Sequence, residues 1–158
     1  MHLKPSQVFW RLRYAIISTK PDLHPCPELR QILGHWALPI ERPQSFMRDG
    51  SFKFLNKRKR LETVGWDGPE CEKLWRYNQH YFDDLNATCA SERYCLHVDL
   101  MRDWTANNPP GEGTGWEPYP TSLRIVNWIK WSLFGHAIPD ECLQSLAVQT
   151  RVLNRKIE

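Results

Sequence analysis

Apolar side chains recur every three or four residues in five segments of the chain, and this spacing predicts five amphipathic helices. Proline in the first turn of three of these segments and Gly135 after the fourth are typical helix start and stop signals. The predicted helices cover about residues 5–20, 71–86, 91–106, 120–135 and 139–158. Four of these helices have a clear stripe on one face. The stripes are Val8, Leu12, Ala15 and Ile16 in the first helix; Leu74, Asn78, Tyr81 and Leu85 in the second; Tyr94, Val98, Met101 and Thr105 in the third; and Leu143, Leu146, Thr150, Leu153 and Ile157 in the fifth.

Two segments between the helices lack this pattern. Residues 21–50 contain five prolines, which fix φ and remove backbone donors, so we expect an extended and irregular segment there. Apolar residues in 52–55 and at Leu61 and Val64 flank the basic run 56–60, which predicts a short β-hairpin with a basic turn. The basic run fits either a solvated turn or a patch for nucleic acid or another anionic polymer.

These elements together predict a mainly all-α fold. The hydrophobic content of 41% and the 8 Trp favour a packed globular body over a disordered chain. We expect one domain with two regions. Residues 1–70 hold the first helix, the Pro-rich segment and the hairpin, and residues 71–158 hold the later helices.

Charge and hydropathy narrow the classes of partner. The net charge of +3 is too small and too scattered to indicate a nucleic-acid partner. No apolar run approaches the roughly 20 residues of a membrane span, so no membrane partner is expected. The first helix is interrupted by Arg11 and Arg13 and lacks a signal-peptide cleavage site. This favours the cytoplasm, or the periplasm if the natural start lies upstream of Met1.

The cysteines give no sign of a metal or cofactor site. There are five, an odd number with irregular spacing, and no C-x-x-C occurs among them. This pattern is typical of reduced thiols in a reducing compartment. We therefore expect no cofactor and no metal.

The segment from Trp116 to Trp131 (WEPYPTSLRIVNWIKW) combines flat aromatic rings with fixed polar groups. A sugar ring can lie on an aromatic face while its hydroxyls and carboxylates bind polar groups, so Trp116, Tyr119 and Asn127 are candidate sugar contacts. Arg124 fits either a substrate carboxylate or an internal ion pair with one of four acids. The four acids are Asp83, Asp84, Asp103 and Glu117, and the expected core residues in this segment are Trp128 and Trp131.

A second candidate surface lies on the predicted helix 71–86. Its polar and aromatic residues fall at i, i+3, i+4 and i+7 and share one face. This face is either the wall of a sugar groove or a half-buried surface whose polar groups are satisfied internally. The four residues are Tyr77, His80, Tyr81 and Asp84, and the neighbouring stripe expected in the core is Leu74, Trp75, Phe82 and Leu85.

Two long motifs resemble a known family. The segments Lys73–Leu85 (KLWRYNQHYFDDL) and Trp116–Trp131, the second preceded by DLMRDWTANNPP, are similar in order and spacing to the N-terminal region of heparinase II/III polysaccharide lyases. The similarity is greatest to versions found in bacterial surface-polysaccharide gene clusters. Leu3 to Tyr14 and Phe52 to Asn56 also look like the opening segments of that family, so the resemblance covers nearly the whole chain.

The resemblance implies an (α/α) toroid with a sugar groove, followed by a β-sandwich, and cleavage of uronic-acid polysaccharides by β-elimination. In that reaction a side chain neutralises the carboxylate, a base removes the C5 proton and an acid protonates the leaving oxygen. The expected partner is an acidic polysaccharide, with heparan sulfate, alginate and a bacterial capsule all open. The expected substrate-binding residues are Tyr77, His80, Tyr81, Trp116, Tyr119, Arg124 and Asn127.

The catalytic part of the family pattern is not matched. The family's N-H-L-x-x-N segment, which supplies the carboxylate-neutralising Asn, would begin after Glu158, and its proton-transfer Tyr and His follow later. We therefore expect a partial toroid from a truncated lyase, inactive without the missing C-terminal part of the same enzyme. Two alternatives remain open: a non-catalytic carbohydrate-binding piece, and a helical interaction domain whose Trp residues are all core.

Overall fold

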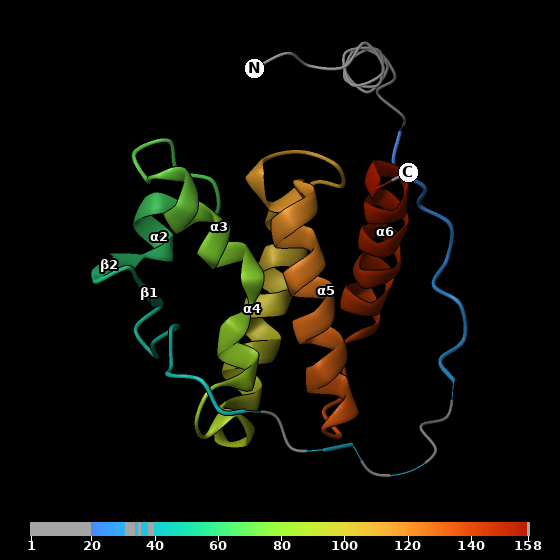
Figure 1. Ribbon diagram of the computed structural model, residues 1–158, viewed down its shortest axis with the longest axis horizontal. Coiled ribbons are helices and arrows are strands. Elements are labelled where there is room, and N and C mark those ends of the chain that lie inside the picture. Colours follow the sequence, from blue (N-terminus) through green and yellow to red (C-terminus); the bar gives the residue numbers. More distant parts are fainter. Residues whose placement is uncertain (1–19, 31–33, 35, 38–39, 158) are drawn as a thin grey trace, which may run out of the picture.

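The computed structural model describes residues 20–30, 34, 36–37 and 40–157, with side chains to residue 156. The described chain is mainly helical, with one small hairpin (Figure 1). Its main elements are β1 (Ser51–Phe54), β2 (Lys57–Arg60), α2 (Leu61–Val64), α3 (Lys73–Tyr81), α4 (Tyr94–Asn107), α5 (Pro118–Leu133) and α6 (Asp140–Ile157). Short 3-10 turns cover η1 (Asp83–Asn86), η2 (Ala90–Arg93) and η3 (Thr114–Trp116).

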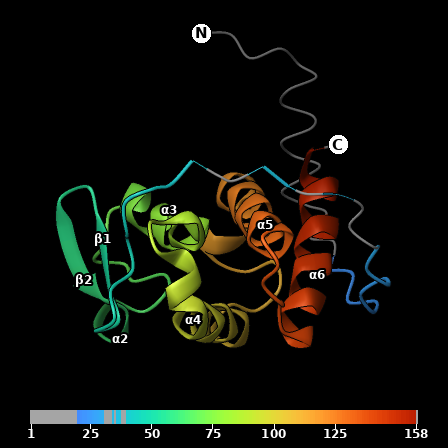
Figure 2. The ribbon, with the colours of Figure 1, turned by 90° about the horizontal axis from the view of Figure 1, so that it is seen from below.

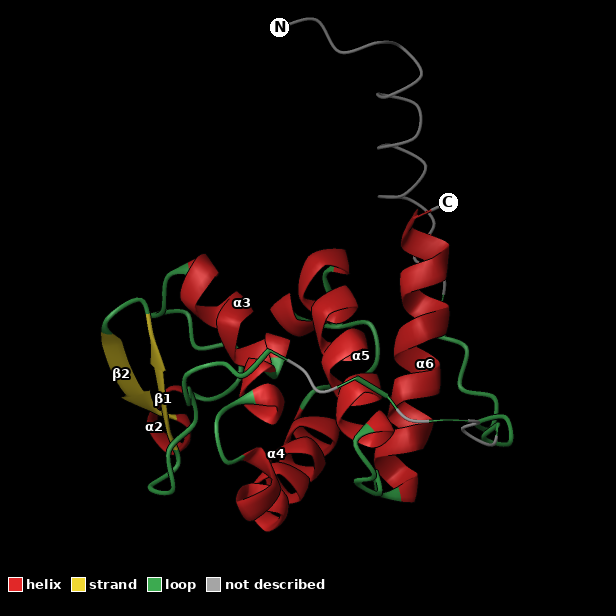
Figure 3. Cartoon of the chain, turned by 60° about the horizontal axis from the view of Figure 1, so that its bottom comes forward, coloured by secondary structure: helices red, strands yellow, loops and turns green. Residues whose placement is uncertain are grey.

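The helices form one packed group with the hairpin at one end. Helix α5 packs against both α3 and α6, and α4 packs against α6. Figure 2 shows α6 at the end opposite the hairpin and α4 on one side of α3 and α5. In Figure 3 the described strands are confined to the hairpin. The mainly all-α prediction is confirmed; the toroid is a finer expectation that this arrangement does not test.

The described part of the Pro-rich segment is irregular, as expected. Long polar side chains of helix α6 bind the start of this segment. Arg155 donates to the carbonyl of Lys20, and Arg151 donates to the carbonyl of His24. Further along, an isolated bridge joins Arg42 to Ala87. The predicted helix over 5–20 lies outside the described residues, apart from Lys20.

The hairpin differs from its prediction in two respects. The basic residues 57–60 form strand β2 and not the turn, which consists of Leu55 and Asn56. Both turn residues have positive φ (50° and 60°), the backbone that a two-residue turn between twisted strands requires. Residues 61–64 continue as one helical turn, α2, and not as strand.

The predicted helix 71–86 is also shorter than expected. Helix α3 ends at Tyr81 because Phe82 adopts a left-handed conformation (φ 58°, ψ 33°), and η1 follows in a new direction. Trp75, Phe82 and Leu85 are buried as predicted, whereas Leu74 is 53% exposed, so its assignment to the core was wrong.

The core is built mainly from aromatic side chains of β1, α3, α4, α5 and the segments between them, to which α6 adds Val148 and Val152. Trp104 of α4 packs edge-on against Phe82 and Trp128, and tilted against Trp116. Trp128 and Trp131 are fully buried, as predicted. On α6 the buried residues are Cys142, Val148, Gln149 and Val152. Of the expected stripe, Leu143 and Leu146 are partly buried and pack against the core, whereas Thr150 is exposed.

None of the described helices is both long enough and apolar enough to cross a membrane. All five cysteines are free thiols, with Cys71 and Cys142 buried and Cys89 and Cys95 exposed.

Candidate functional site

The rings of three tyrosines from two helices meet where α5 begins: Tyr119 is exposed, Tyr77 is half-buried and Tyr81 is buried (7% exposed). The ring of Tyr119 lies 6.3 Å from that of Tyr77 and 5.7 Å from that of Tyr81, measured between centroids. Pro118 and Pro120 start α5 and so fix the position of Tyr119, whose side chain is 58% exposed. We call Tyr77, Tyr81 and Tyr119 the tyrosine surface.

A charged pair borders this surface. Lys73 Nζ lies 2.9 Å from a Glu117 carboxylate oxygen and 5.2 Å from the centre of the Tyr77 ring. The Tyr77 hydroxyl donates to the same carboxylate. Partial burial alone would raise the pKa of Glu117, but the hydrogen bonds from Tyr77 and Lys73 lower it below its ordinary value. Glu117 is therefore a carboxylate at neutral pH, and it holds both neighbours in place.

Tyr77 and Tyr81 remain protonated at neutral pH. Burial, followed by the nearby Tyr119, Tyr77 and Asp83, raises the pKa of Tyr81 to about 12. Burial and the Glu117 carboxylate also raise the pKa of Tyr77. These two side chains therefore carry neutral hydroxyl groups.

Asn127 lies behind the tyrosine surface and positions it. Its amide nitrogen donates to the carbonyl of Tyr81 (2.7 Å) and to Asp83 (2.9 Å), and its oxygen accepts from Asn86 (2.9 Å). The residue is buried, so its amide ties α5 to the end of α3 and to η1. The bonds explain why the chain can turn sharply after Tyr81.

Trp116 and Arg124 lie in the interior and not on the surface. Trp116 is 1% exposed and Arg124 is 0% exposed. The Arg124 guanidinium stacks 3.7 Å from the centre of the Trp104 ring. It donates to Gln149 (2.9 Å) and to the carbonyl of Gly115 (2.9 Å).

Trp116 and Arg124 are therefore not accessible as sugar contacts in this structure, whereas Tyr119 reaches solvent. Arg124 also has no carboxylate partner among the described residues, so the expected internal ion pair is absent there. Burial without a counter-charge lowers its pKa well below the ordinary value. Its role in this structure is to cross-link α5, α6 and η3.

His80 is likewise an interior residue. Its ring is fully buried, stacks on Trp66 and accepts a hydrogen bond from Trp104. Burial, and then the charge of Arg124, lowers its pKa to about 3, so the ring is neutral. Of the seven predicted contacts, the tyrosine surface brings together three, while His80, Trp116, Arg124 and Asn127 lie beneath.

Sequence reasoning missed a buried ionic cluster centred on Asp84. One carboxylate oxygen accepts the backbone N–H groups of Ser45 and Phe46 at 2.7 and 2.9 Å. The other lies 2.8 Å from Arg93 and 3.1 Å from His97. Burial would raise the pKa of Asp84, but these hydrogen bonds outweigh it and lower the pKa. The cluster fastens the Pro-rich segment to the helices.

A cleft of about 790 Å³ lies elsewhere, between the hairpin side and the end of α4. Its wall contains Trp66 and five acidic residues, and none of the lining residues is Lys or Arg. None of the expected sugar contacts lines this cleft, and its charge disfavours an anionic ligand. The acidic lining residues are Asp49, Glu62, Asp67, Asp103 and Glu112.

Within the part of the chain that the structure describes, no three His, Cys, Asp or Glu side chains gather in a way that could hold a metal ion. Comparison of the sequence with family models and with curated proteins, and of the fold with solved structures, finds no match.

Proposed function

We propose that this chain binds an acidic polysaccharide at the tyrosine surface, as the helical part of a lyase similar to the heparinase II/III family. The observation that carries the proposal is the exposed ring of Tyr119, which is flanked by two further tyrosine rings and lies beside the Lys73–Glu117 pair. An aromatic face suits the C–H face of a sugar, and an ammonium group suits its carboxylate.

The proposal assigns binding to this chain and not proton transfer. A base that removes the C5 proton needs a pKa near neutrality and access to the substrate. Tyr81 has a pKa of about 12, and His80 is buried with a pKa of about 3, so neither meets both conditions. β-Elimination would then use groups from another part of the same enzyme.

The partial (α/α) toroid belongs to this proposal. Helix α5 exposes Tyr119, Val126 and Ile129, of which the last two are 46% and 43% exposed. Residues seven and ten positions apart lie on one helix face, so this is a continuous apolar strip. In a toroid the Val126 and Ile129 part of such a strip would be covered by a neighbouring helix, and the Tyr119 part by substrate.

Calorimetric titration with oligogalacturonate tests the proposed function. We expect binding by the wild type and at least tenfold weaker binding by Tyr119→Ala, whereas Tyr119→Phe retains the affinity because it retains the ring. Val126→Ala serves as the matched control on the same helix, away from the tyrosines. Equal affinities for wild type and Tyr119→Ala would exclude the tyrosine surface as the site.

One observation favours a second candidate, a helical interaction domain. Six of the Trp residues lie in the buried core, which is what that alternative expects of them; they are Trp66, Trp75, Trp104, Trp116, Trp128 and Trp131. Trp36 does not fit this expectation, because its side chain is 56% exposed. A protein partner would bind the apolar strip of α5. The variant Ile129→Lys would therefore abolish binding of that partner and leave glycan binding intact.

A further inference from the structure

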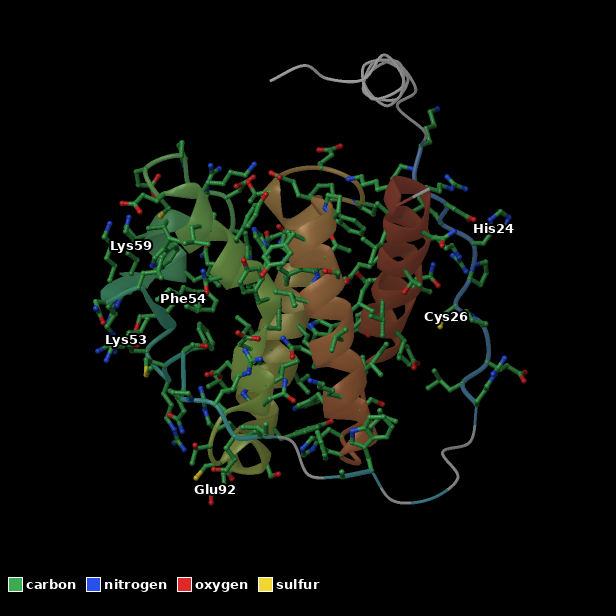
Figure 4. The ribbon with its side chains drawn as sticks, in the orientation of Figure 1. His24, Cys26, Lys53, Phe54, Lys59 and Glu92 are labelled. Carbon is green, nitrogen blue, oxygen red and sulfur yellow. The ribbon has the colours of Figure 1, made fainter. Side chains whose placement is uncertain are left out.

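The hairpin presents a row of cations on its outward face. The register pairs Lys53 with Arg58 and Ser51 with Arg60, so these side chains alternate onto the same face. Lys53, Arg58 and Arg60 are exposed, and we call them the outer hairpin face. Figure 4 shows Lys53 at the outer margin of the molecule, with Phe54 nearer to the helices.

The opposite face of the hairpin is anchored in the core. Phe52 and Phe54 are buried, and both pack edge-on against Trp75 of α3. Phe52 also packs against Phe46 and Trp66. The cations of the outer face therefore project from a rigid support, which lowers the entropy lost when a ligand binds them.

The charge on the hairpin is not balanced locally. Residues 48–60 contain six Lys and Arg and one Asp, an excess greater than the +3 of the entire chain. Arg58 donates to Ser51 (2.7 Å) and Asp49 (2.8 Å). The side chains of Lys53 and Arg60 have no hydrogen-bond or ion-pair partner in the described chain.

Two of the cations on this face repel each other. Like charges directly opposite each other on two strands repel, and Lys53 faces Arg58 in this way, although Arg58 also pairs with Asp49. An anionic ligand along the outer face would remove the repulsion and supply partners for the two unpaired side chains.

The edge of the hairpin separates the outer hairpin face from the tyrosine surface. Lys57, next to Arg58 on β2, faces the other way, opposite Phe54, and pairs with Glu72 at 2.6 Å. The residue after Glu72 is Lys73, which borders Tyr77. A ligand of one or two sugars would reach only one of the two surfaces, whereas a polymer that passes the hairpin edge at Lys57 would reach both.

We infer that the outer hairpin face, through Lys53, Arg58 and Arg60, is a second contact surface for the same acidic polysaccharide and binds a run of uronate carboxylates. This inference rests on the proposed function, because the polymer that reaches the hairpin is the one held at the tyrosine surface. Residues two apart on a strand lie about 7 Å from each other, so Arg58 and Arg60 take separate anionic groups.

The test measures binding of polygalacturonate to the variant Lys53→Gln with Arg60→Gln at low and high ionic strength. We expect Kd to rise about tenfold at low ionic strength and its salt dependence to become flatter. The control, Arg30→Gln with Lys130→Gln, removes the same charge elsewhere and leaves Kd unchanged. The exchange Lys53→Arg with Arg60→Lys keeps both charges and retains the affinity, which separates charge from folding.

Each failure has a distinct signature. Suppose that the variant with both Lys53→Gln and Arg60→Gln binds polygalacturonate as the wild type does, while Tyr119→Ala binds it weakly. The role of the outer hairpin face is then overturned and the proposed function stands. If the wild type binds no polygalacturonate at all, the proposed function falls first. Equal or tighter binding of double-stranded DNA, lost in the same variant, would overturn the assignment to a polysaccharide.

Discussion

Trp104 Nε1 donates a hydrogen bond to Nδ1 of His80 across 2.9 Å of buried core. The bond fixes the tautomer, because Nδ1 must be the acceptor and the ring proton then lies on Nε2. It also joins α4 to α3 at the centre of the aromatic cluster. His80 is thus held neutral, and this has a measurable consequence for stability.

We expect the free energy of unfolding to fall as the pH drops below about 6.5. The unfolded chain takes up a proton on His80 near that pH, whereas the folded chain does not until about pH 3, so acid favours unfolding in this window. The slope should be about 1.4 kcal/mol per pH unit. Urea unfolding at several pH values, with and without His80→Gln, measures it.

The control for this prediction is His24→Gln, since the His24 side chain is 85% exposed and lies outside the core. That variant should keep the wild-type slope. Asp84 does not interfere, because its folded-state pKa is lowered from 3.8 and its contribution is lost only under more acidic conditions. An unchanged slope in His80→Gln would contradict the prediction.

Gly115→Ala should destabilise the protein through the same pair. A Cβ added at Gly115 would lie 2.7 Å from His80 Nδ1, the atom that accepts from Trp104. The ring would have to move, and overpacking of this kind costs about 1–3 kcal/mol. Thermal or urea unfolding measures the loss.

Gly135→Ala is the matched comparison for Gly115→Ala. Nothing lies within 4 Å of a Cβ at Gly135, but its φ of 86° is left-handed. It should therefore lose only about 1 kcal/mol, from backbone strain. A smaller loss at Gly115 than at Gly135 would show that His80 can shift without penalty.

Helix starts and stops could be predicted because proline and glycine act locally. Pro118 and Pro120 begin α5, Pro139 precedes α6, and Gly135 lies between them with positive φ. The end of α3 could not be predicted in this way. Phe82 has no preference for the left-handed region, and its conformation is held by distant partners of the residues on either side.

The burial of Arg124 could have been predicted from its spacing to the core tryptophans, although its charge alone suggests an exposed position. It precedes Trp128 by four residues and Trp131 by seven, so it lies on the stripe already assigned to the core. The partners of Arg124 could not be predicted, because the carbonyl of Gly115 and the amide of Gln149 meet only in the folded chain. The Asp84 cluster depends on equally distant contacts.

Asp84→Asn should be the most destabilising single change in that cluster. It would leave Arg93 buried without its counter-charge and weaken the acceptor for Ser45 and Phe46. Breaking one partner of a buried pair costs about 3–5 kcal/mol. Equilibrium unfolding in urea measures this loss.

The comparison for Asp84→Asn is Glu141→Gln. It breaks the Arg102–Glu141 pair, which is half exposed and lies on the surface of α4 and α6. Solvent screens an exposed pair of this kind, so this variant should be nearly as stable as the wild type. Similar losses in the two variants would mean that Asp84 is not a buried ionic centre.

Arg124→Lys separates a structural role from a ligand-binding role. The guanidinium stacks on Trp104 and donates to both Gln149 and Gly115, and an ammonium group cannot make these contacts together. We expect a loss of about 2–3 kcal/mol in unfolding free energy, since a buried cation would lose its partners. Affinity for oligogalacturonate, measured on the folded fraction at low temperature, should stay within about twofold of the wild type.

Tyr119→Ala should show the converse, with weak binding and nearly unchanged stability, because its ring is largely in solvent. If Arg124→Lys instead lost binding and kept its stability, Arg124 would have to reach the ligand in a conformation other than this one.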